Sequence, residues 1–415
     1  MDVDVVIFGG GAAGLWLLDE LARRGDRVVL LEAGRLGQGQ TVGSQGIIHG
    51  GLKYTLQGLL TPAAREIRDM PEVWRQSLAG LRTPDLRQTR VRSQACHLWR
   101  SESLRSKLGM LGARVGLHVA PCELSADERP PALAGCPGTV ARLDEQVISP
   151  ASFVADLARQ HAGRLLAIDA ADGIKVTLSC PGVVARIALS HPHGTTSIAI
   201  VPRHVVLTAG AGNGPLRSLC GLSPARMQLR PLHMVLVRGD LPVVNGHCVD
   251  GARTRVTITA DRDSQGRTVW QVGGQLAEDG VACDERTLVR RAQAELAAVL
   301  PGVDFAGHEW ATYRVDRAEL ASPRASRPDT ATVAHEGNVI TAWPTKLALA
   351  PQLARMAAEC IAPARAVPLI SDSPVQIAPL PELCDWPRPE VAMPVWETVR
   401  EWQRLDAGAR IRDAA

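Results

Sequence analysis

The sequence has few aromatic residues, no long apolar run and little net charge. Phe, Trp and Tyr together make up 3% of the 415 residues, and only two of them are Tyr. No apolar run approaches the roughly 20 residues that a membrane-spanning helix needs, so we expect no integral membrane segment. The formal net charge of +3 gives no strong field for nucleic acid, which we exclude as a partner. A globular protein of one or two domains is expected.

Cysteine is present but follows no pattern that carries chemistry. The nine cysteines are odd in number and scattered, without a C-x-x-C pair. Reduced thiols are therefore expected rather than a disulfide framework, and no metal site is predicted from their spacing. The chain opens directly into an apolar, strand-like segment without a secretory signal pattern. We expect a cytoplasmic protein, and peripheral contact with a membrane stays open.

The strongest pattern is a glycine turn that follows an apolar strand. Residues 4–8 form an apolar run typical of a buried parallel strand. Gly9, Gly11 and Gly14 then follow in the spacing G-x-G-x-x-G. The first glycine permits a tight turn, the second lets a pyrophosphate approach the backbone, and the third lets a helix pack on the strand. This spacing predicts a dinucleotide-binding unit.

The residues after the turn support the same prediction. A helix expected from about residue 12 to 24 begins with Ala12 and Ala13, and its N-terminal N–H groups face the phosphates. Glu32 ends the next apolar strand, at a distance from Gly14 where such units carry an acid that binds the ribose hydroxyls. A negative charge there disfavours NADP. FAD or NAD fits, and the position of the unit at the start of the chain favours FAD.

Alternating strand and helix patterns predict an α/β (α+β composite) fold. Strands are expected at 174–179, 183–189, 197–201, 234–237, 254–259, 268–272, 310–314 and 338–343, and helices at 62–80, 284–300, 351–361 and 395–405. A Rossmann-like FAD-binding domain is expected to interleave with an antiparallel-sheet substrate domain. The first comprises residues 1–84, 146–220 and 310–362, the second comprises 85–145 and 221–309, and a proline-rich tail covers 363–415.

Three further segments, taken with the glycine turn, carry a resemblance to a known family. They read Ser-Gln-Gly-Ile-Ile-His-Gly-Gly-Leu-Lys-Tyr (44–54), Val-Val-Leu-Thr-Ala-Gly (205–210) and Thr-Lys-Leu-Ala-Leu-Ala-Pro (345–351). In this order the chain resembles the FAD-dependent D-amino-acid oxidase superfamily over about residues 1–362. The first segment is most similar to His-Gly-Gly-Leu-Arg-Tyr of flavin glycerol-3-phosphate dehydrogenases and to a related Ile-His-Ser-Gly stretch of L-2-hydroxyglutarate oxidases.

The resemblance implies that FAD is the cofactor. It also implies that the second glycine-rich loop, residues 33–54, runs along the flavin, and that the helix at Lys346 offers N–H groups to the flavin. The expected cofactor-binding residues are Gly9, Gly11, Ala12, Ala13, Gly14, Glu32, Ser44, Gln45, Gly46, Ile47, Val184, Gly210, Lys346 and Leu347.

The same resemblance implies a hydride transfer from a small anionic substrate to flavin N5. The candidates for catalysis are His49 and His233 as alternative general bases, Lys53, Arg314 and Lys346 as a cationic clamp, and Tyr54 as a hydroxyl donor, a role that Tyr313 could share. Each has a structural alternative, such as a solvated lysine or a surface ion pair. The sequence departs from the family where Lys53 replaces Arg and Thr345 replaces Gly, and it lacks a long C-terminal helical domain.

Three functions stay open at this point. The first is oxidation of a 2-hydroxy acid or a polyol phosphate, the second is oxidation of an amino acid or secondary amine, and the third is a flavoprotein without turnover. The electron acceptor could be O₂, a quinone or another protein.

Overall fold

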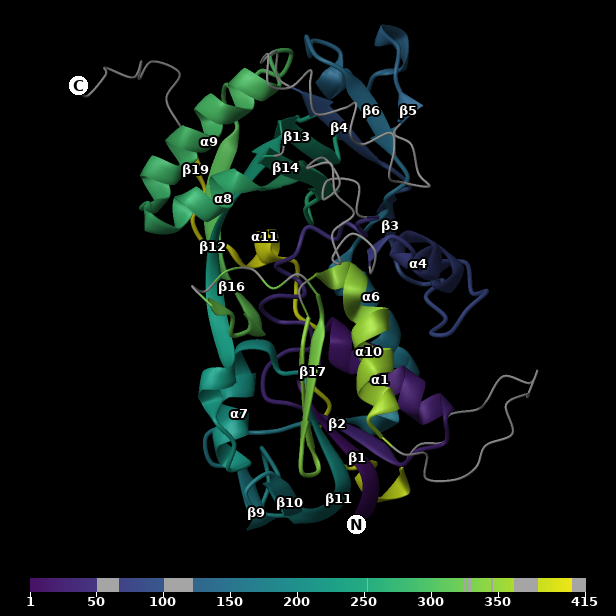
Figure 1. Cartoon of the computed structure of the whole chain (residues 1–415). Coiled ribbons are helices and arrows are strands. Elements are labelled where there is room, and N and C mark those ends of the chain that lie inside the picture. Colours follow the sequence, from purple (N-terminus) through teal and green to yellow (C-terminus); the bar gives the residue numbers. More distant parts are fainter. Residues whose placement is uncertain are drawn as a thin grey trace.

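The structure is a computed structural model that describes residues 1–50, 67–100, 122–251, 253–323, 326, 328, 330–344, 346–361 and 380–404. One sheet lies near the N-terminus with helices against it, and a larger sheet occupies the other end of the molecule (Figure 1). The long strands β12 (Met227–Gly239) and β16 (Glu309–Leu320) of the larger sheet extend toward the first. The expected composite of two interleaved sheets is confirmed.

The first sheet has eight strands around a parallel centre. Its order is β17 (Thr332–Glu336), β18 (Val339–Trp343), β11 (Ser197–Leu207), β1 (Asp2–Phe8), β2 (Val28–Glu32) and β8 (Leu165–Ala167), with β10 (Val183–Ser190) and β9 (Ile174–Cys180) attached to β11. Strand β1 is buried on both faces of this sheet, since Val5 and Ile7 pack in one core cluster and Val6 and Phe8 in another. This explains why residues 4–8 are a continuous apolar run.

Strand β11 joins two segments that the sequence presents separately. Its first residues, 197–200, pair antiparallel with β10, whereas the following residues pair parallel with β1. The strand changes its partner without ending, so the expected strand 197–201 and the apolar run before the turn at Gly210 are one element.

The second sheet has nine strands. Its order is β19 (Gln403–Arg404), β16, β12, β15 (Thr268–Gly273), β14 (Arg253–Arg262), β13 (Gly246–Asp250), β4 (Cys96–Arg100), β6 (Val140–Leu143) and β5 (Cys122–Glu123). Strands β16 and β12 pair from Met227 opposite Leu320 to Arg238 opposite Glu309. The sequence-based division places residues 310–320 in the first domain, but this pairing places them in the second sheet. Such a long-range pairing leaves no local signal.

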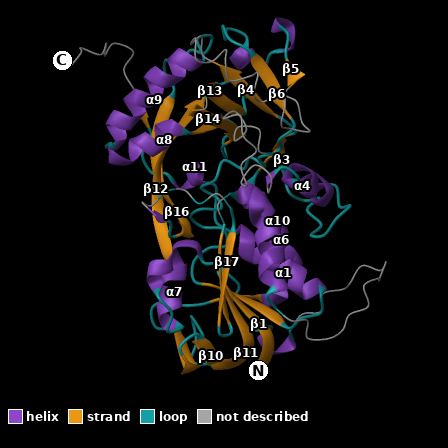
Figure 2. Cartoon of the chain, in the orientation of Figure 1, coloured by secondary structure: helices purple, strands orange, loops and turns teal. Residues whose placement is uncertain are grey.

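The α-helices among the described residues are α1 (Ala12–Arg23), α4 (Met70–Leu78), α6 (Pro150–Gln160), α7 (Asn213–Leu219), α8 (Gln275–Asp279), α9 (Glu285–Val299), α10 (Ala350–Glu359) and α11 (Val395–Thr398), and β3 (Val91–Ser93) pairs with β7 (Val147–Ile148) apart from both sheets. Helices α1, α4, α9 and α10 lie at expected segments, although residues 62–66 of the expected helix 62–80 lie outside the described residues. Helices α1, α6 and α10 share one apolar core against the first sheet (Figure 2). Helix α9 begins where the Asp284 side chain accepts the Thr287 N–H, as the pattern 284–300 predicts.

The described part of the C-terminal segment, residues 380–404, crosses from one sheet to the other. Val391 forms a bridge with Leu36 beside the first sheet, and β19 adds an edge strand to β16 of the second. The helix expected over 395–405 is wrong in length, because α11 ends at Thr398 and the chain becomes extended. Pairing with β16 outweighs the local helical pattern there.

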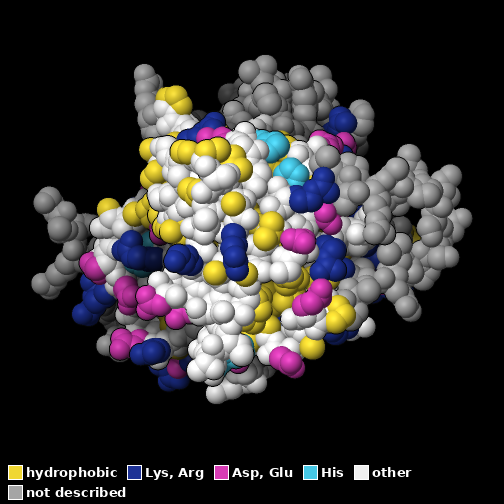
Figure 3. Space-filling view, turned by 90° about the horizontal axis from the view of Figure 1, so that it is seen from below, with side chains coloured by type: hydrophobic (Ala, Val, Ile, Leu, Met, Phe, Trp, Pro, Cys, Tyr) yellow, Lys and Arg dark blue, Asp and Glu magenta, His cyan; other side chains and the backbone are white. Residues whose placement is uncertain are grey.

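The composition made two predictions, one about the cysteines and one about membrane-spanning helices. All nine cysteines are free thiols. No helix among the described residues is long and apolar enough to cross a membrane. On the face seen in Figure 3, cationic and acidic side chains are interspersed, in keeping with the small net charge.

Candidate cofactor cavity and active site

A large cavity lies between the two sheets. Its volume is about 1280 Å³, and its wall includes the glycine turn after β1, the second glycine-rich loop and residues of β12, β14 and β16. Pockets for drug-sized ligands typically measure about 300–1,000 Å³. This cavity is therefore large enough for an extended dinucleotide together with a small substrate.

The glycine turn has the geometry that its spacing predicts. Gly9 adopts φ +103°, and a Cβ atom there would lie 2.4 Å from the Cα of Ala209. A Cβ atom at Gly14 would lie 2.1 Å from the Gly9 carbonyl oxygen. Gly14 does not line the cavity, so its part is to let α1 pack closely on β1 rather than to contact a ligand. Any side chain at either position would displace the turn.

The start of α1 and the end of β2 form one end of the cavity. Helix α1 has no acidic residue in its first turn, and the Ala12 N–H donates to Thr41 Oγ1 at 3.1 Å. The Glu32 carboxylate accepts the N–H groups of Gly10 at 2.7 Å and Gly34 at 2.8 Å. Each carboxylate oxygen has a second acceptor position, and Glu32 lines the cavity. The start of α1 therefore fits the phosphates of FAD, and Glu32 fits its ribose.

Side chains of the second sheet hold the second glycine-rich loop in place. Tyr313 Oη donates to the Gly43 carbonyl at 2.8 Å and accepts from Gln271 Nε2 at 3.0 Å. Gln45 Nε2 donates to the carbonyls of Thr257 and Gln271, both at 2.9 Å. Burial raises the pKa of Tyr313, so its hydroxyl stays protonated. Tyr313 therefore anchors the loop, a role different from the substrate contact suggested by the sequence.

Most of the predicted residues share this cavity. Those that line it are Gly9, Gly11, Ala12, Ala13, Glu32, Ser44, Gln45, Gly46, Ile47, His49, Gly210, Arg314, Lys346 and Leu347. Lys53 and Tyr54 lie outside the residues that the structure describes. Gly14, Val184 and His233 are described but are not part of the wall.

His233 faces away from the cavity. Its neighbours Leu232 and Met234 line the wall, and because side chains alternate along a strand, His233 lies on the opposite face of β12. Its Nδ1 donates to the Gly280 carbonyl at 3.2 Å, and its Nε2 is 3.0 Å from Thr312 Oγ1. Burial lowers its pKa. His233 is a satisfied core histidine, and we withdraw it as a candidate base.

Val184 also has a structural role. Its backbone N–H donates to Asn338 Oδ1 at 2.8 Å, and its carbonyl accepts from Asn338 Nδ2 at 2.9 Å. Because both backbone groups are engaged by one asparagine side chain, Val184 joins β10 to the turn before β18. The proposal that it binds the cofactor is withdrawn.

Several cationic side chains line the cavity, but they differ in how their charge is balanced. Arg317 pairs with Glu278, Arg253 with Asp279 and Arg35 with Glu390, at 2.9, 2.8 and 3.2 Å. Arg314 instead donates to the carbonyls of Val281 and Cys283 at 3.0 and 3.1 Å. Among the described residues it forms no ion pair. Its exposed guanidinium has no carboxylate partner among the described residues, but Arg314 pairs directly with His233 across the two strands, so its side chain lies on the face of β16 that is turned away from the cavity.

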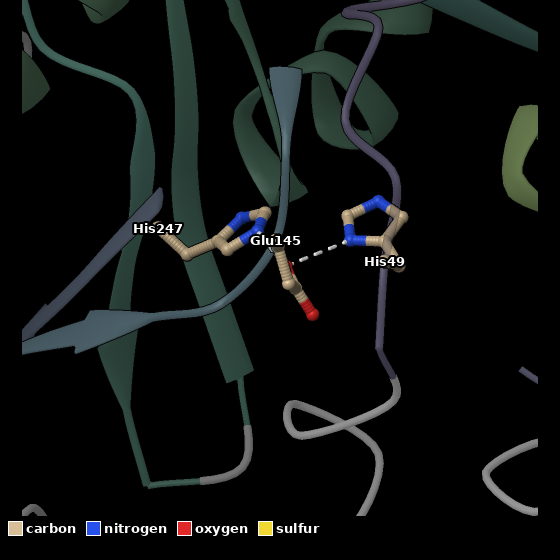
Figure 4. Close-up of side chains that lie close together, drawn as sticks. All are labelled: His49, Glu145 and His247. Atoms are coloured by element: carbon tan, nitrogen blue, oxygen red, sulfur yellow. Dashed lines mark ion pairs between the residues drawn. The ribbon is translucent and has the colours of Figure 1, made fainter. Parts of the chain in front are cut away.

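His49 lies beside two residues, Glu145 and His247, that the sequence analysis did not identify. Its Nδ1 is 3.5 Å from Glu145 Oε2, and His247 Nε2 is 4.0 Å from the same oxygen (Figure 4). The two imidazole rings stack with centroids 5.4 Å apart. Glu145 follows β6 and His247 lies in β13, and neither belongs to a motif that sequence analysis could recognise. The ligand atoms of all three lie within 4.8 Å of one another, so they are also potential metal ligands.

Comparison with known proteins agrees with this geometry. A family model described as FAD dependent oxidoreductase (DAO) matches residues 4–359. The chain is 40% identical to the probable FAD-dependent oxidoreductase PA4991 of Pseudomonas aeruginosa, over 96% of this chain and 98% of the relative. The crystal structure of PA4991 matches with a TM-score of 0.76 and 37% identity over the same shares of the two chains.

Two more distant structures share the fold alone. Glycine oxidase from Geobacillus kaustophilus matches with a TM-score of 0.56 and 18% identity, over 87% of this chain and 94% of that one. FAD-bound L-α-glycerophosphate oxidase from Mycoplasma pneumoniae matches with a TM-score of 0.58 and 14% identity, over 87% and 95%. The extent of the family match and the identity to PA4991 confirm the predicted fold class and cofactor. The chain belongs to the DAO family of FAD-dependent oxidoreductases.

Proposed function

We propose that this oxidoreductase removes two electrons from a CH–OH group of a small anionic substrate, either a 2-hydroxy acid or a polyol phosphate. The observation that carries the proposal is that Lys346 and His49, an ammonium group and a carboxylate-facing imidazole, line the same cavity. FAD, when bound, supplies the acceptor for the electrons and the hydrogen that leave the substrate carbon. The chain's own residues then have to bind the anion and remove a proton.

Lys346 is the proposed anion-binding residue. An ammonium group binds a carboxylate or a phosphate as a compact point charge. Lys346 belongs to the cationic clamp that the resemblance implies, and it lines the cavity together with Leu347. We expect an anionic substrate to bind beside it.

His49 is the proposed general base. Imidazole titrates near neutral pH and can accept a proton when the substrate is oxidised. A hydroxyl group is a much weaker acid than an ammonium group, so a CH–OH donor depends more on a positioned base than a CH–NH donor. The carboxylate beside His49 supports a base of this kind, and this favours the CH–OH class over an amine.

The experiment is anaerobic reduction of the holoenzyme by a substrate panel. Purified protein with bound FAD is mixed under nitrogen with 2-hydroxy acids, polyol phosphates, amino acids and secondary amines, and loss of flavin absorbance is recorded. The proposal expects bleaching by an anionic hydroxy compound. Bleaching by amino acids or amines alone would show that the substrate is a CH–NH donor. If no compound in the panel bleaches the flavin while dithionite does, the proposed substrate class is wrong.

The acceptor of the reoxidation step is a second part of the proposal. After bleaching, O₂, a soluble quinone or a protein acceptor is added separately, and the rate at which absorbance returns identifies the acceptor.

A further inference from the structure

We propose that Glu145 and His247 are positioning residues that set the protonation state and orientation of His49 in the cavity. The inference rests on the proposed function, because it assigns to these residues the support of the base named there. The three side chains come from three separate parts of the chain: the second glycine-rich loop, the turn between β6 and β7, and strand β13 (Figure 4).

One carboxylate oxygen faces both imidazole rings. Oε2 of Glu145 lies 3.5 Å from His49 Nδ1 and 4.0 Å from His247 Nε2. The other oxygen, Oε1, accepts the N–H of Gly50 at 2.7 Å. The backbone that carries His49 therefore also orients the carboxylate, so the pair is held from both sides.

His247 is itself held in one orientation. Its Nδ1 lies 2.9 Å from Thr257 Oγ1 in the neighbouring strand β14. This contact leaves Nε2 turned toward Glu145, and the ring of His247 stacks on the ring of His49 with 29° between their planes. Thr257, His247, Glu145 and His49 thus contact one another in series, and the two end residues, Thr257 and His49, line the cavity.

Burial makes the charge of Glu145 costly unless it is balanced. The exposed fractions of the side chains are 16% for His49, 6% for Glu145 and 1% for His247. A buried carboxylate needs hydrogen-bond donors or a positive partner. Since a carboxylate only accepts hydrogen bonds, the imidazole nitrogens that face it are stabilised in their N–H form. His49 is then an Nδ1–H tautomer, and its Nε2 is the nitrogen that can accept a proton.

In this arrangement Glu145 orients the His49 imidazole and stabilises its protonated form, as a buried carboxylate does behind a catalytic histidine. When the O–H bond of the substrate breaks, the proton forms a bond to His49 Nε2, and Nδ1–H stays in place. Glu145 remains ionised and stabilises the imidazolium across the 3.5 Å separation. His247 keeps the carboxylate from turning away. The neighbouring carboxylate, that of Asp144, forms an ion pair with Arg75 at 2.9 Å.

A metal ion bound by the same three residues is the competing explanation. Two histidines and a carboxylate can bind zinc, but ligand atoms about 2.1 Å from a tetrahedral ion lie only ~3.4 Å apart. The separation of 4.0 Å between His247 and Glu145 exceeds this value. We therefore assign the group to proton chemistry.

The test measures the rate constant of flavin bleaching by the identified substrate, as a function of pH, in the FAD-loaded protein. Glu145→Gln keeps the size of the side chain and removes its charge. We expect the limiting rate constant to fall about 100-fold while the substrate dissociation constant changes less than about threefold. The apparent pKa of the acidic limb should move to lower pH, because the imidazolium loses its stabilising charge. Glu145→Asp should restore part of the rate.

Two further variants separate the alternatives. His247→Phe keeps the stacked ring but removes both nitrogens, and about a tenfold loss of rate is expected. Glu123→Gln changes an exposed glutamate in β5 and serves as the matched control. FAD content and thermal unfolding are measured for every variant, so that loss of folding is recognised.

The outcomes distinguish failure of the inference from failure of the proposed function. If His49→Asn abolishes bleaching but Glu145→Gln behaves like Glu123→Gln, His49 remains the base and the positioning inference is overturned. If His49→Asn bleaches normally, the proposed base itself is wrong. One equivalent of metal in the purified protein, lost in Glu145→Gln, would replace the inference with a metal site.

Discussion

The hydroxyl of Tyr313 in β16 donates a hydrogen bond to the carbonyl of Gly43, 2.8 Å away in the second glycine-rich loop. One side chain of the second sheet thereby fixes a loop that lines the cofactor cavity. The shape of the FAD-binding wall thus depends on a side chain of the second sheet.

Removal of this hydroxyl should loosen the loop. Tyr313→Phe loses the hydrogen bond to the Gly43 carbonyl and removes the hydroxyl that accepts from Gln271 Nε2. A hydrogen bond of this kind contributes about 0.5–1.5 kcal/mol. We expect up to about a tenfold rise in the FAD dissociation constant, measured by titration of the apoprotein. Ser218→Ala, which removes a distant hydroxyl that donates to the Gly214 carbonyl, should leave FAD binding unchanged. Equal affinity in both variants contradicts the anchoring role.

A methyl group at Gly14 should separate α1 from β1. The added Cβ atom would lie 2.1 Å from the Gly9 carbonyl oxygen, so the helix has to move. Overpacking of this kind costs about 1–3 kcal/mol. Gly14→Ala is expected to lower both the thermal midpoint and the FAD content. Gly302→Ala is the control, since a Cβ atom there is 3.7 Å from its nearest neighbour. If Gly14→Ala binds FAD like the control, the close packing described here is incorrect.

Replacement of Lys346 should weaken substrate binding more than it changes the flavin. Lys346→Met removes the charge but keeps much of the apolar stem. Because hydrogen bonds to charged groups contribute about 1.5–3 kcal/mol, KM should rise roughly 10- to 150-fold. The visible flavin spectrum and the FAD content should stay close to the parent. Lys175→Met, which changes an exposed lysine in β9, provides the comparison. Loss of FAD without a change in KM would make Lys346 a structural residue.

Acidification should destabilise the fold in part through His233. Burial lowers the pKa of His233 in the folded protein below the ordinary value near 6.5. As the pH falls through 6.5, the unfolded chain binds a proton that the folded chain resists, so stability decreases by up to about 1.4 kcal/mol per pH unit for this group. Urea unfolding at pH 7.5 and 5.5 measures the loss.

The variant His233→Asn isolates this contribution. Its amide can still donate toward the Gly280 carbonyl, which the Nδ1–H group contacts in the parent, but it does not titrate. The variant should therefore lose less stability between pH 7.5 and 5.5. Burial also lowers the pKa values of His97 and His204, so some pH dependence should remain. Identical losses in parent and variant would assign the effect to those other histidines.

The sequence was most informative where the structure is local. Gly9, Gly14 and Glu32 lie in one strand, turn and helix unit, so their spacing alone predicts the turn and the acid that faces it. Local patterns also located β12, β14 and β15, although these strands extend beyond the predicted segments. Their exact ends are set by pairing, which a linear pattern does not contain.

Long-range contacts explain the predictions that were wrong and the residues that were missed. His233 was a candidate because its context resembles that of a strand histidine in the family, but the apolar residues on either side of it occupy the cavity face. The partners of His49 follow β6 and lie in β13, and only folding brings them to the second glycine-rich loop. No spacing rule connects three such positions. Tyr313 was noticed for its rarity, whereas its anchoring contact became visible only in three dimensions.

The path of the C-terminal segment has a consequence for biosynthesis. Ala392, Met393, Val395 and Thr398 form part of the cavity wall, and β19 then completes the edge of the second sheet. A ribosome must therefore translate nearly all of this sequence before the compartment can close. An emerging chain that stops before residue 392 lacks this part of the wall and should hold the coenzyme less tightly than a longer one.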